Sequence, residues 1–355
     1  MKSIASAPAK IILLGEHFVV YGSKAMLAAI DKRVTVTTTF TEKSTIKVNS
    51  ELGTLEVPTY VSYQEVKSEF RPFVYLAKKM INSTEWENAK PAKGLEIEIN
   101  SDIPVGVGLG SSSACCVATA ASIYGLFKKL SSEEIVEISI EAEKTIFPDT
   151  SGADCTVCTY GGMIVYDKIN GIEKIDSTKY KIKDFETVTD LNFIIANSMI
   201  PHSTKRSVER VKKFKENDED EFAREVGYAT NLINNVLYAL KNNDDDDKLE
   251  MRNCSGFRDE LMFNMSDNRM LLEGIGVSNK TIDSMITSLV RGTDDGGAAL
   301  VSTKITGAGD GGCIIALASD VERDLTRARA VLPKDKECFS AKIDTKGVVW
   351  GMIEE

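Results

Sequence analysis

The sequence predicts an α+β protein of two lobes, which would divide the chain into residues 1–185 and residues 186–355. The length of 355 residues is more than one hydrophobic core usually serves. Segments typical of strands bracket segments typical of helices in both halves of the chain, and no repeat of solenoid period is present. We therefore expect a ligand site in the cleft between the two lobes.

Strand-forming residues dominate the first part of the chain, from residue 3 to about residue 57. The segments 11–14 and 34–40 are rich in apolar and β-branched residues. A helix is expected over 73–80. The segment 95–99 alternates apolar and acidic residues, which is typical of a strand with one face in water. Together these segments predict a sheet with a helix packed on it.

The Gly/Ser-rich segment that follows is the strongest indication of a function. Residues 104–114 have the sequence PVGVGLGSSSA and lead into an uncharged segment that ends near residue 127. Backbone N–H groups at a helix N-terminus favour phosphate, because the helix dipole places partial positive charge there. The segment lacks the Gly-Lys-Ser/Thr ending of a P-loop, and its helical part of about fifteen residues is too short for a membrane span. We predict a phosphate-binding loop before a buried helix.

The next helix begins at a capping box formed by Ser131 and Glu134. Helical periodicity places Glu143 at the edge of the apolar face of this helix, so its carboxylate is expected to be half-buried. Strands are predicted over 155–165 and 191–196.

The segment from residue 202 to about residue 290 is mainly helical in pattern. It is interrupted by an acidic run at 242–248, which predicts a solvated loop rather than a calcium site, because an EF-hand loop needs a glycine and spaced ligands. A second glycine-rich segment, 307–312, matches the dinucleotide fingerprint G-x-G-x-x-G, which requires a helix after it. The apolar segment 313–318 is more typical of a buried strand. We therefore interpret 307–312 as a turn between two strands that approaches a ligand.

Composition excludes several classes of function. Hydrophobic residues make up 43% and charged residues 27%, as in ordinary globular proteins, and the net charge is −10. Nucleic acids and anionic membranes are disfavoured as main partners because both require a basic surface. The seven cysteines include the adjacent pair Cys115 and Cys116, which argues against a disulfide framework and for a reducing cytoplasm. A lone C-x-x-C at 155–158 makes a zinc site improbable.

Four features together point to phosphoryl transfer. The loop 106–113 supplies a phosphate cradle, and Glu143 supplies a hard oxygen ligand for Mg²⁺. The segment 149–154 contains a candidate base, and Lys10 with the segment 15–17 contains a candidate cation.

Three motifs in this order resemble those of the GHMP kinase superfamily and, within it, of mevalonate kinases of the archaeal type. They are residues 8–22 (PAKIILLGEHFVVYG), residues 104–114 and residues 304–313 (KITGAGDGGC). A weaker match is residues 203–205 (STK), followed by Val208 and Val211. The resemblance implies the two-lobed GHMP kinase fold, with an N-terminal lobe like domain 2 of ribosomal protein S5 and a ferredoxin-like C-terminal lobe.

The resemblance also implies ATP and Mg²⁺ as cofactors, with Ser111 and Glu143 holding the metal. The implied nucleotide-binding residues are Pro104, Gly106, Val107, Gly108, Leu109, Gly110, Ser111, Ser112 and Ser113. The implied catalytic residues are Asp154, which faces the acceptor hydroxyl, and Lys10, which keeps that carboxylate ionised. The implied acceptor-binding residues are Lys10, Glu16, His17, Asp154, Thr204, Gly307, Ala308 and Gly309.

The reaction implied by the resemblance is the ATP-dependent phosphorylation of the primary hydroxyl of mevalonate to 5-phosphomevalonate, a step in isoprenoid precursor synthesis. Mevalonate and ATP are then the partners, with no nucleic acid and no membrane, and a homodimer is compatible with this interpretation. The alternatives are another GHMP kinase, acting on phosphomevalonate, homoserine or a sugar, or a GHMP-fold protein that binds a ligand without catalysis. The apolar segment 18–21 disfavours a sugar.

The chain departs from the family pattern at three places. Thr150 and Cys155 stand where many members have proline and asparagine, and Asp149 is a rival to Asp154 as the base. Asp310 occupies a place that is usually glycine. A carboxylate there would repel a triphosphate unless it points away or binds a metal.

Overall fold

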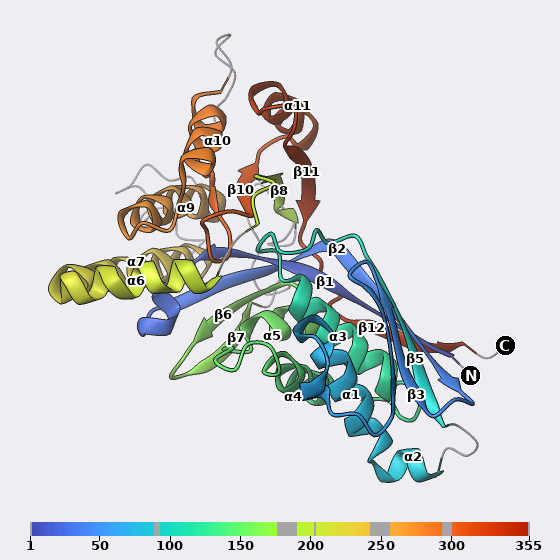
Figure 1. The fold of residues 1–355 in the computed structure, drawn as a ribbon. Helices are drawn as coiled ribbons and strands as arrows, with labels where there is room; N and C mark the ends of the chain where they lie inside the picture. Colours follow the sequence, from blue (N-terminus) through green and yellow to red (C-terminus); the bar gives the residue numbers. More distant parts are fainter. Residues whose placement is uncertain are drawn as a thin grey trace.

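The computed structural model describes residues 2–88, 93–175, 190–201, 204–241, 256–292 and 300–353. Figure 1 shows a larger lobe built on a long curved sheet and a smaller lobe built on a second sheet, which confirms the predicted α+β class. The predicted boundary near residue 185 and the acidic run at 242–248 lie outside the described residues.

Eight strands of the described chain form the larger sheet. They are β1 (Lys2–Leu14), β2 (Lys24–Thr41), β3 (Thr45–Ser50), β4 (Gly53–Pro58), β5 (Gly94–Ser101), β6 (Met163–Asp167), β7 (Gly171–Ile175) and β12 (Val349–Ile353). The main path has the order β12-β1-β2-β5-β3-β4, and β6 pairs with the first part of β2. The β3–β5 pair is parallel, and the other pairs are antiparallel.

The pairing of β1 with β2 positions Lys10. The register shifts between Pro8 and Ala9 and again between Ile12 and Leu14. Proline has no N–H for a ladder hydrogen bond and is therefore found at such irregularities. Lys10 lies on the short regular stretch between the two shifts.

Helices cover one face of this sheet (Figure 1). They are α1 (Arg71–Ile81), α2 (Thr84–Asn88), α3 (Ser111–Tyr124), α4 (Ser132–Glu143) and α5 (Ala153–Tyr160), with short 3-10 turns at Phe18–Tyr21, Tyr63–Glu65 and Ser68–Phe70. The predicted helix at 73–80, the strand at 95–99 and the helix after the Gly/Ser loop are confirmed. The capping box at Ser131 is also confirmed, because the Ser131 side chain accepts from the Glu134 N–H and the Glu134 carboxylate accepts from the Ser131 N–H.

The prediction of a strand over 155–165 was wrong. The chain forms α5 up to Tyr160, and β6 begins only at Met163. The hydroxyls of Thr156 and Thr159 donate to carbonyls four residues earlier, at 2.9 Å and 2.8 Å, so these β-branched residues fit a helix. Six of the eight helical residues are buried, which removes the one-sided periodicity that would have revealed the helix.

The smaller lobe contains an antiparallel sheet of β8 (Asn192–Asn197), β9 (Lys304–Ile305), β10 (Cys313–Ala318) and β11 (Glu337–Lys342), in the order β11-β8-β10-β9. Within the described ranges its helices are α6 (Thr204–Asn217), α7 (Glu219–Lys241), α9 (Phe257–Gly274), α10 (Lys280–Arg291) and α11 (Val321–Val331). The segment 307–312 is the turn between β9 and β10, as predicted, and a strand follows it in place of the helix that a dinucleotide fingerprint requires.

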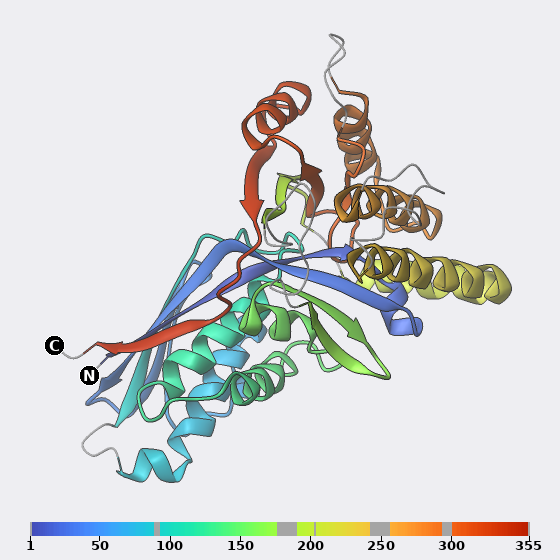
Figure 2. The same ribbon diagram turned by 180° about the vertical axis from the view of Figure 1, so that it is seen from behind.

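The last strand returns to the larger sheet. β12 pairs with β1, so that Lys2 lies opposite Ile353, and both ends of the chain lie at the same end of the sheet (Figures 1 and 2). The larger lobe is therefore completed by residues from the far end of the sequence. None of the helices in the described ranges combines the length and the apolar character that a membrane span requires.

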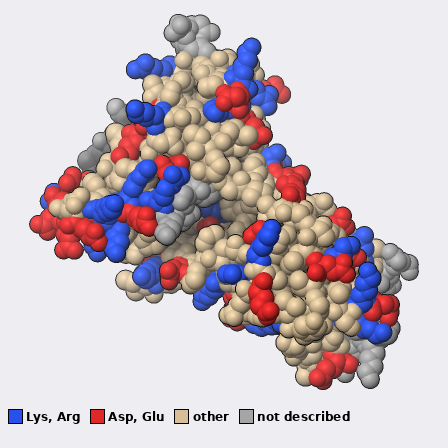
Figure 3. All heavy atoms as spheres, viewed as in Figure 1, with Lys and Arg blue, Asp and Glu red and all other residues tan. Residues whose placement is uncertain are grey.

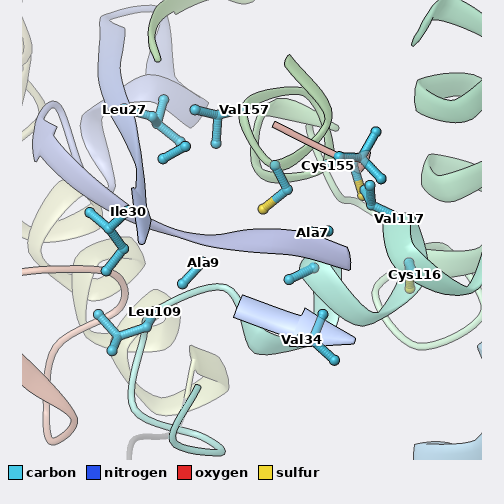
Figure 4. Packing of buried hydrophobic residues seen from close by; sticks show 14 of the residues in the cluster. Ala7, Ala9, Leu27, Ile30, Val34, Leu109, Cys116, Val117, Cys155 and Val157 are labelled. Carbon is cyan, nitrogen blue, oxygen red and sulfur yellow. The ribbon is translucent and has the colours of Figure 1, made fainter. Parts of the chain in front are cut away.

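Small side chains bring the loop and two helices close to β1. Figure 4 shows Ala7 and Ala9 of β1 among Leu27, Ile30 and Val34 of β2, Leu109 of the loop, Cys116 and Val117 of α3, and Cys155 and Val157 of α5. All of these side chains are essentially inaccessible to solvent. Because alanine adds little bulk, the glycine-rich loop at 104–113 and the start of α5 can both lie near Lys10 on the same strand.

Candidate active site

The segment 104–113 forms an open loop in front of α3. Gly106, Gly108 and Gly110 have left-handed φ values of 71°, 88° and 74°. The first helical hydrogen bond joins the Ala114 N–H to the Gly110 carbonyl at 2.9 Å, so the N–H groups of the preceding three serines have no acceptor within the helix. The backbone thus presents N–H groups at a helix N-terminus, which is the geometry that favours an anion.

Lys10 runs beneath this loop. Its backbone N–H donates to the Leu109 carbonyl at 2.9 Å. A Cβ atom at Gly110 would lie 2.6 Å from Cγ of Lys10, so only glycine allows the lysine side chain to pass. On the other side, the Cys313 N–H donates to the Val107 carbonyl at 2.9 Å. The loop is therefore held between β1 and the turn at 307–312.

Lys10 forms an ion pair with Asp154, with 3.0 Å between Nζ and Oδ2. The Lys10 side chain is 4% exposed and the Asp154 side chain 33% exposed, so the lysine is buried and the carboxylate is open to a ligand. Asp154 lies in the first turn of α5, where the helix dipole favours a carboxylate. Asp149 is exposed, and the ion pair of Lys10 is made with Asp154. The geometry thus selects Asp154 over its rival as the partner of Lys10.

Glu143 ends α4 and is buried, more completely than the half-burial that periodicity predicts. The Ser113 hydroxyl donates to Oε1, the Thr150 hydroxyl donates to Oε2 at 2.6 Å, and the Cys155 thiol lies 3.6 Å from Oε2. Burial raises the pKa of the Glu143 carboxyl above its ordinary value, and the negative charge of Asp154 raises it further. The site therefore holds two carboxylates that repel each other.

The donor set at Glu143 fits a hard cation. Mg²⁺ prefers oxygen ligands and is usually bound by one or two carboxylates together with the phosphates of a substrate. Across the described ranges no group of three or more His, Cys, Asp or Glu side chains is arranged to hold a metal. Ser111 is the first residue of α3, and its hydroxyl contacts the Cys115 thiol.

Glu16 lies in a buried ion pair with Lys304, a residue 288 positions away. Nζ of Lys304 also donates to the carbonyls of Ile12 at 3.2 Å and Ile305 at 2.6 Å. The second carboxylate oxygen of Glu16 accepts from Asn268 at 2.9 Å. Burial lowers the pKa of Lys304, and the Glu16 carboxylate opposes this effect. Both oxygens of Glu16 are thus engaged within the protein, where they join the end of β1 to the smaller lobe.

His17 is one of three described non-glycine residues with positive φ, at 61°. Its Nε2 lies 2.9 Å from the Ala308 carbonyl, and burial lowers its pKa. Since a carbonyl can only accept, Nε2 carries the proton of the neutral ring and Nδ1 is an acceptor. Gly307, next to Ala308, packs against Gly108 of the glycine-rich loop at 104–113. Thr204 is the first residue of α6, and its side chain lies outside the described part.

These residues come from both lobes. The space-filling view shows the surface hollowed between the lobes, with basic side chains at its rim and charged atoms at its floor (Figure 3). The cleft expected from the sequence is therefore present.

Comparison with known proteins identifies the family. Residues 73–162 match the N-terminal domain of GHMP kinases. The mevalonate kinase of Thermococcus sibiricus is 32% identical over 92% of this chain and 92% of its own length, and that of Pyrococcus furiosus is 33% identical over the same shares. The chain belongs to the mevalonate kinase family. The crystal structure of the Methanococcus jannaschii mevalonate kinase matches it with a TM-score of 0.74 at 24% identity, covering 96% of this chain and 98% of that one. The predicted GHMP kinase fold is confirmed.

Two departures from the mevalonate kinase pattern meet at one carboxylate. Thr150 and Cys155, which replace the usual proline and asparagine, both lie against Oε2 of Glu143. The third departure, Asp310, is paired with Arg206 and Arg210 of α6. Each unusual residue therefore has a partner in this member of the mevalonate kinase family.

Several contacts in the site escaped the sequence analysis. Lys304 belongs to the third motif, but the motif indicates no role for it. Nothing in the sequence around Asn268 indicates that it lies in the site. Lys304 is the basic residue at the start of an otherwise apolar strand pattern, and a cation in such a place requires an anionic partner. That rule could have paired it with an acid, but nothing local pointed to Glu16.

Proposed function

We propose that this protein transfers the γ-phosphoryl group of ATP to the primary hydroxyl of mevalonate. The observation that carries the proposal is the Lys10–Asp154 ion pair at 3.0 Å beneath the phosphate-binding loop. Two residues 144 positions apart in the sequence are brought together at a helix N-terminus suited to anions. The relatives named mevalonate kinase, which match 92% of the chain, support this choice of acceptor.

Asp154 is the proposed base, and its action follows from the nature of phosphoryl transfer. The bond from the acceptor oxygen to phosphorus forms as the bond from phosphorus to the leaving oxygen of ADP breaks, through a loose transition state. An alcohol is too weak an acid to be deprotonated beforehand, so Asp154 accepts the proton late. Lys10 keeps positive charge beside the attacking oxygen. Positioning and charge neutralisation then supply most of the rate enhancement.

We also propose Ser111 and Glu143 as the ligands of Mg²⁺. When bound, the metal neutralises charge on the β- and γ-phosphate oxygens. The support is the position of the Glu143 carboxylate, which is buried and accepts from Ser113 at the start of α3; burial and the nearby charge of Asp154 raise its pKa. The Ser113 and Thr150 hydroxyls orient that carboxylate by donating to opposite oxygens.

The acceptor side is formed, in this proposal, by His17, Ala308 and the start of α6. Nδ1 of His17 accepts a hydrogen bond from the acceptor, because Nε2 is committed to the Ala308 carbonyl. Glu16 supports this segment from beneath through Lys304. We place the reaction in the cytoplasm, since all six described cysteines are free thiols, and a homodimer stays a prediction.

The function is tested by ADP release from purified protein with mevalonate, phosphomevalonate, homoserine and galactose. We expect turnover with mevalonate. In Asp154→Asn, kcat should fall by about a hundredfold to ten-thousandfold with nucleotide affinity retained. Asp149→Asn is the matched control and should remain active. Turnover of another acceptor would show that mevalonate is not the substrate, and turnover of none would favour a GHMP-fold protein that binds a ligand without catalysis. Full activity in Asp154→Asn would refute the assignment of Asp154 as the base.

A further inference from the structure

Asp310 is an unexpected residue in the turn between β9 and β10. It has a left-handed φ of 59°, a conformation that costs most non-glycine residues energy and that asparagine and aspartate tolerate best. Its side chain is 8% exposed. A carboxylate buried in a turn that approaches the phosphate-binding loop would repel a nucleotide unless its charge were compensated.

Two arginines of α6 compensate this charge. Nη1 of Arg210 donates to Oδ1 of Asp310 at 3.0 Å, and Nε of Arg206 lies 3.5 Å from Oδ2. Oδ2 is buried and has no hydrogen-bond partner among the described residues, so its attraction to Arg206 is mainly that of opposite charges. The arginines are more exposed than the aspartate, at 44% for Arg210 and 62% for Arg206. The aspartate therefore forms the inner part of a three-residue cluster on the surface of α6.

The cluster joins three segments that are distant in sequence. Arg210 also points its Nη1 at the Gly276 carbonyl, 3.4 Å away, in the connection between α9 and α10. The N–H of Asp310 donates to the carbonyl of the neighbouring Val277 at 2.8 Å. The turn at 307–312 is thus fixed both through its backbone and through the Asp310 side chain.

The same turn carries contacts that reach the active site. Ala308, two residues before Asp310, holds the His17 ring through its carbonyl. Gly312, two residues after Asp310, donates to the Ile200 carbonyl at 2.8 Å, close in sequence to the start of α6. A displacement of Asp310 would therefore move the carbonyl that orients His17 relative to the N-terminal end of α6.

We propose that Asp310 is a positioning residue for acceptor binding. Through Arg206 and Arg210 it holds α6 against the turn at 307–312, and so fixes the Ala308 carbonyl and His17 on the acceptor side of the cleft. The inference rests on the proposed function in one respect, namely that the acceptor is mevalonate. The charge of Asp310 is the essential property, because asparagine fits the same backbone and nearly the same volume without attracting two guanidinium groups.

Asp310→Asn is the first test. We expect the KM for mevalonate to rise about tenfold, while kcat and the KM for ATP change by less than about twofold. A merely destabilised variant would lose apparent kcat through its unfolded fraction but would keep the KM of the molecules that remain folded. Arg210→Gln should raise the KM for mevalonate as Asp310→Asn does, and the KM of the double variant should be no higher than that of either single variant. Arg210→Lys, which keeps the positive charge, should have a lower KM for mevalonate than Arg210→Gln.

Glu216→Gln is the control on the same helix, since it removes the exposed Lys212–Glu216 pair, whose N–O distance is 3.8 Å, without touching the turn. It should leave both KM values unchanged. Added salt should raise the KM for mevalonate more in the wild type than in Asp310→Asn, because screening weakens the cluster only where the charge is present. An unchanged KM for mevalonate in Asp310→Asn, or equal increases for mevalonate and ATP, would overturn the proposal.

Hydrogen exchange provides a readout that needs no turnover. The amides of Asp310 and Gly312, which donate to Val277 and Ile200, should exchange faster in Asp310→Asn than in the wild type, and the amides of α11 should not. If mevalonate is not a substrate but this local loosening occurs, the proposed function fails and the positioning of the turn stands. If mevalonate is turned over and exchange is unchanged, the inference fails alone.

Discussion

His17 combines a strained backbone with a half-buried, neutral ring. A φ of 61° persists in such a residue only where its surroundings fix it, and here the Ala308 carbonyl and the end of β1 do so. Since burial lowers its pKa, the ring stays uncharged at neutral pH and keeps Nδ1 available as an acceptor. Protonation would convert that acceptor into a donor.

The lowered pKa of His17 makes stability depend on pH. The unfolded chain takes up a proton as pH falls through the ordinary value of 6.5, whereas the folded protein does so only at lower pH. Stability is therefore lost on acidification through this window, by at most about 1.4 kcal/mol per pH unit. In His17→Asn, which keeps a residue suited to left-handed backbone, this part of the loss should be absent. Urea unfolding between about pH 7 and pH 5 measures the difference, and parallel curves for the two proteins would contradict it.

The roles of single residues could be predicted only where a motif carried them. Lys10, Glu143 and Asp154 stand in segments whose pattern indicates phosphoryl transfer, and the structure brings Lys10 to Asp154. The depth at which Glu143 is buried could not be predicted, because α3 and α5 supply the groups that cover it. Periodicity describes one helix at a time and does not report what packs against its edge.

At the level of elements, the loop before α3 depends on glycine for two separable reasons. Gly106 and Gly110 both have left-handed φ, but a Cβ at Gly106 would meet nothing within 4 Å, whereas at Gly110 it would strike Lys10. Alanine substitutions at these two glycines therefore distinguish the effect of backbone strain from that of a collision with the Lys10 side chain.

Gly110→Ala should lower kcat by at least about tenfold, because Lys10 must move away from Asp154. Gly106→Ala should cost only the backbone strain of a left-handed alanine, about 1–2 kcal/mol of stability or nucleotide affinity, with kcat nearly unchanged. Single-turnover kinetics and nucleotide titrations separate the two effects. Equal kcat values in the two variants would show that the collision with Lys10 is relieved without displacing it.

Prediction of elements succeeded where local patterns are strong and failed where burial is uniform. The capping box at Ser131 and the alternation in β5 identified their elements directly. α5 was missed because its buried residues show no polar face, and short apolar segments of strand and helix look alike in sequence. The functional prediction for its first turn came from the motif that contains Asp154, which does not depend on whether the segment is a helix or a strand.

At the level of the whole molecule, the chain closes on itself through β12. This strand pairs with β1 from Ser6 to Lys2, and Trp350 packs against the larger core. Its place in the sheet could not be predicted, since residues 349–353 lie more than 340 positions from their partners and carry no local sign of pairing.

Removal of residues 348–355 should destabilise the larger lobe by on the order of 2 kcal/mol or more, because ladder hydrogen bonds and part of the Trp350 burial are lost. It should also promote association through the newly exposed edge of β1. The KM values of the folded fraction should be unchanged, since β12 pairs with β1 only up to Ser6. Thermal unfolding and light scattering test this, with removal of residues 354 and 355 alone as the control. An unaltered midpoint would show that β12 is dispensable.

The buried pair of Glu16 and Lys304 limits how the enzyme can open during turnover. It ties the end of the first strand to the smaller lobe in a place that water does not reach. If the two lobes separated at this pair, Glu16 and Lys304 would each be left as a buried charge without its partner, at a cost of several kcal/mol on each cycle. We therefore expect this junction to stay closed during turnover and any opening of the cleft to take place away from it.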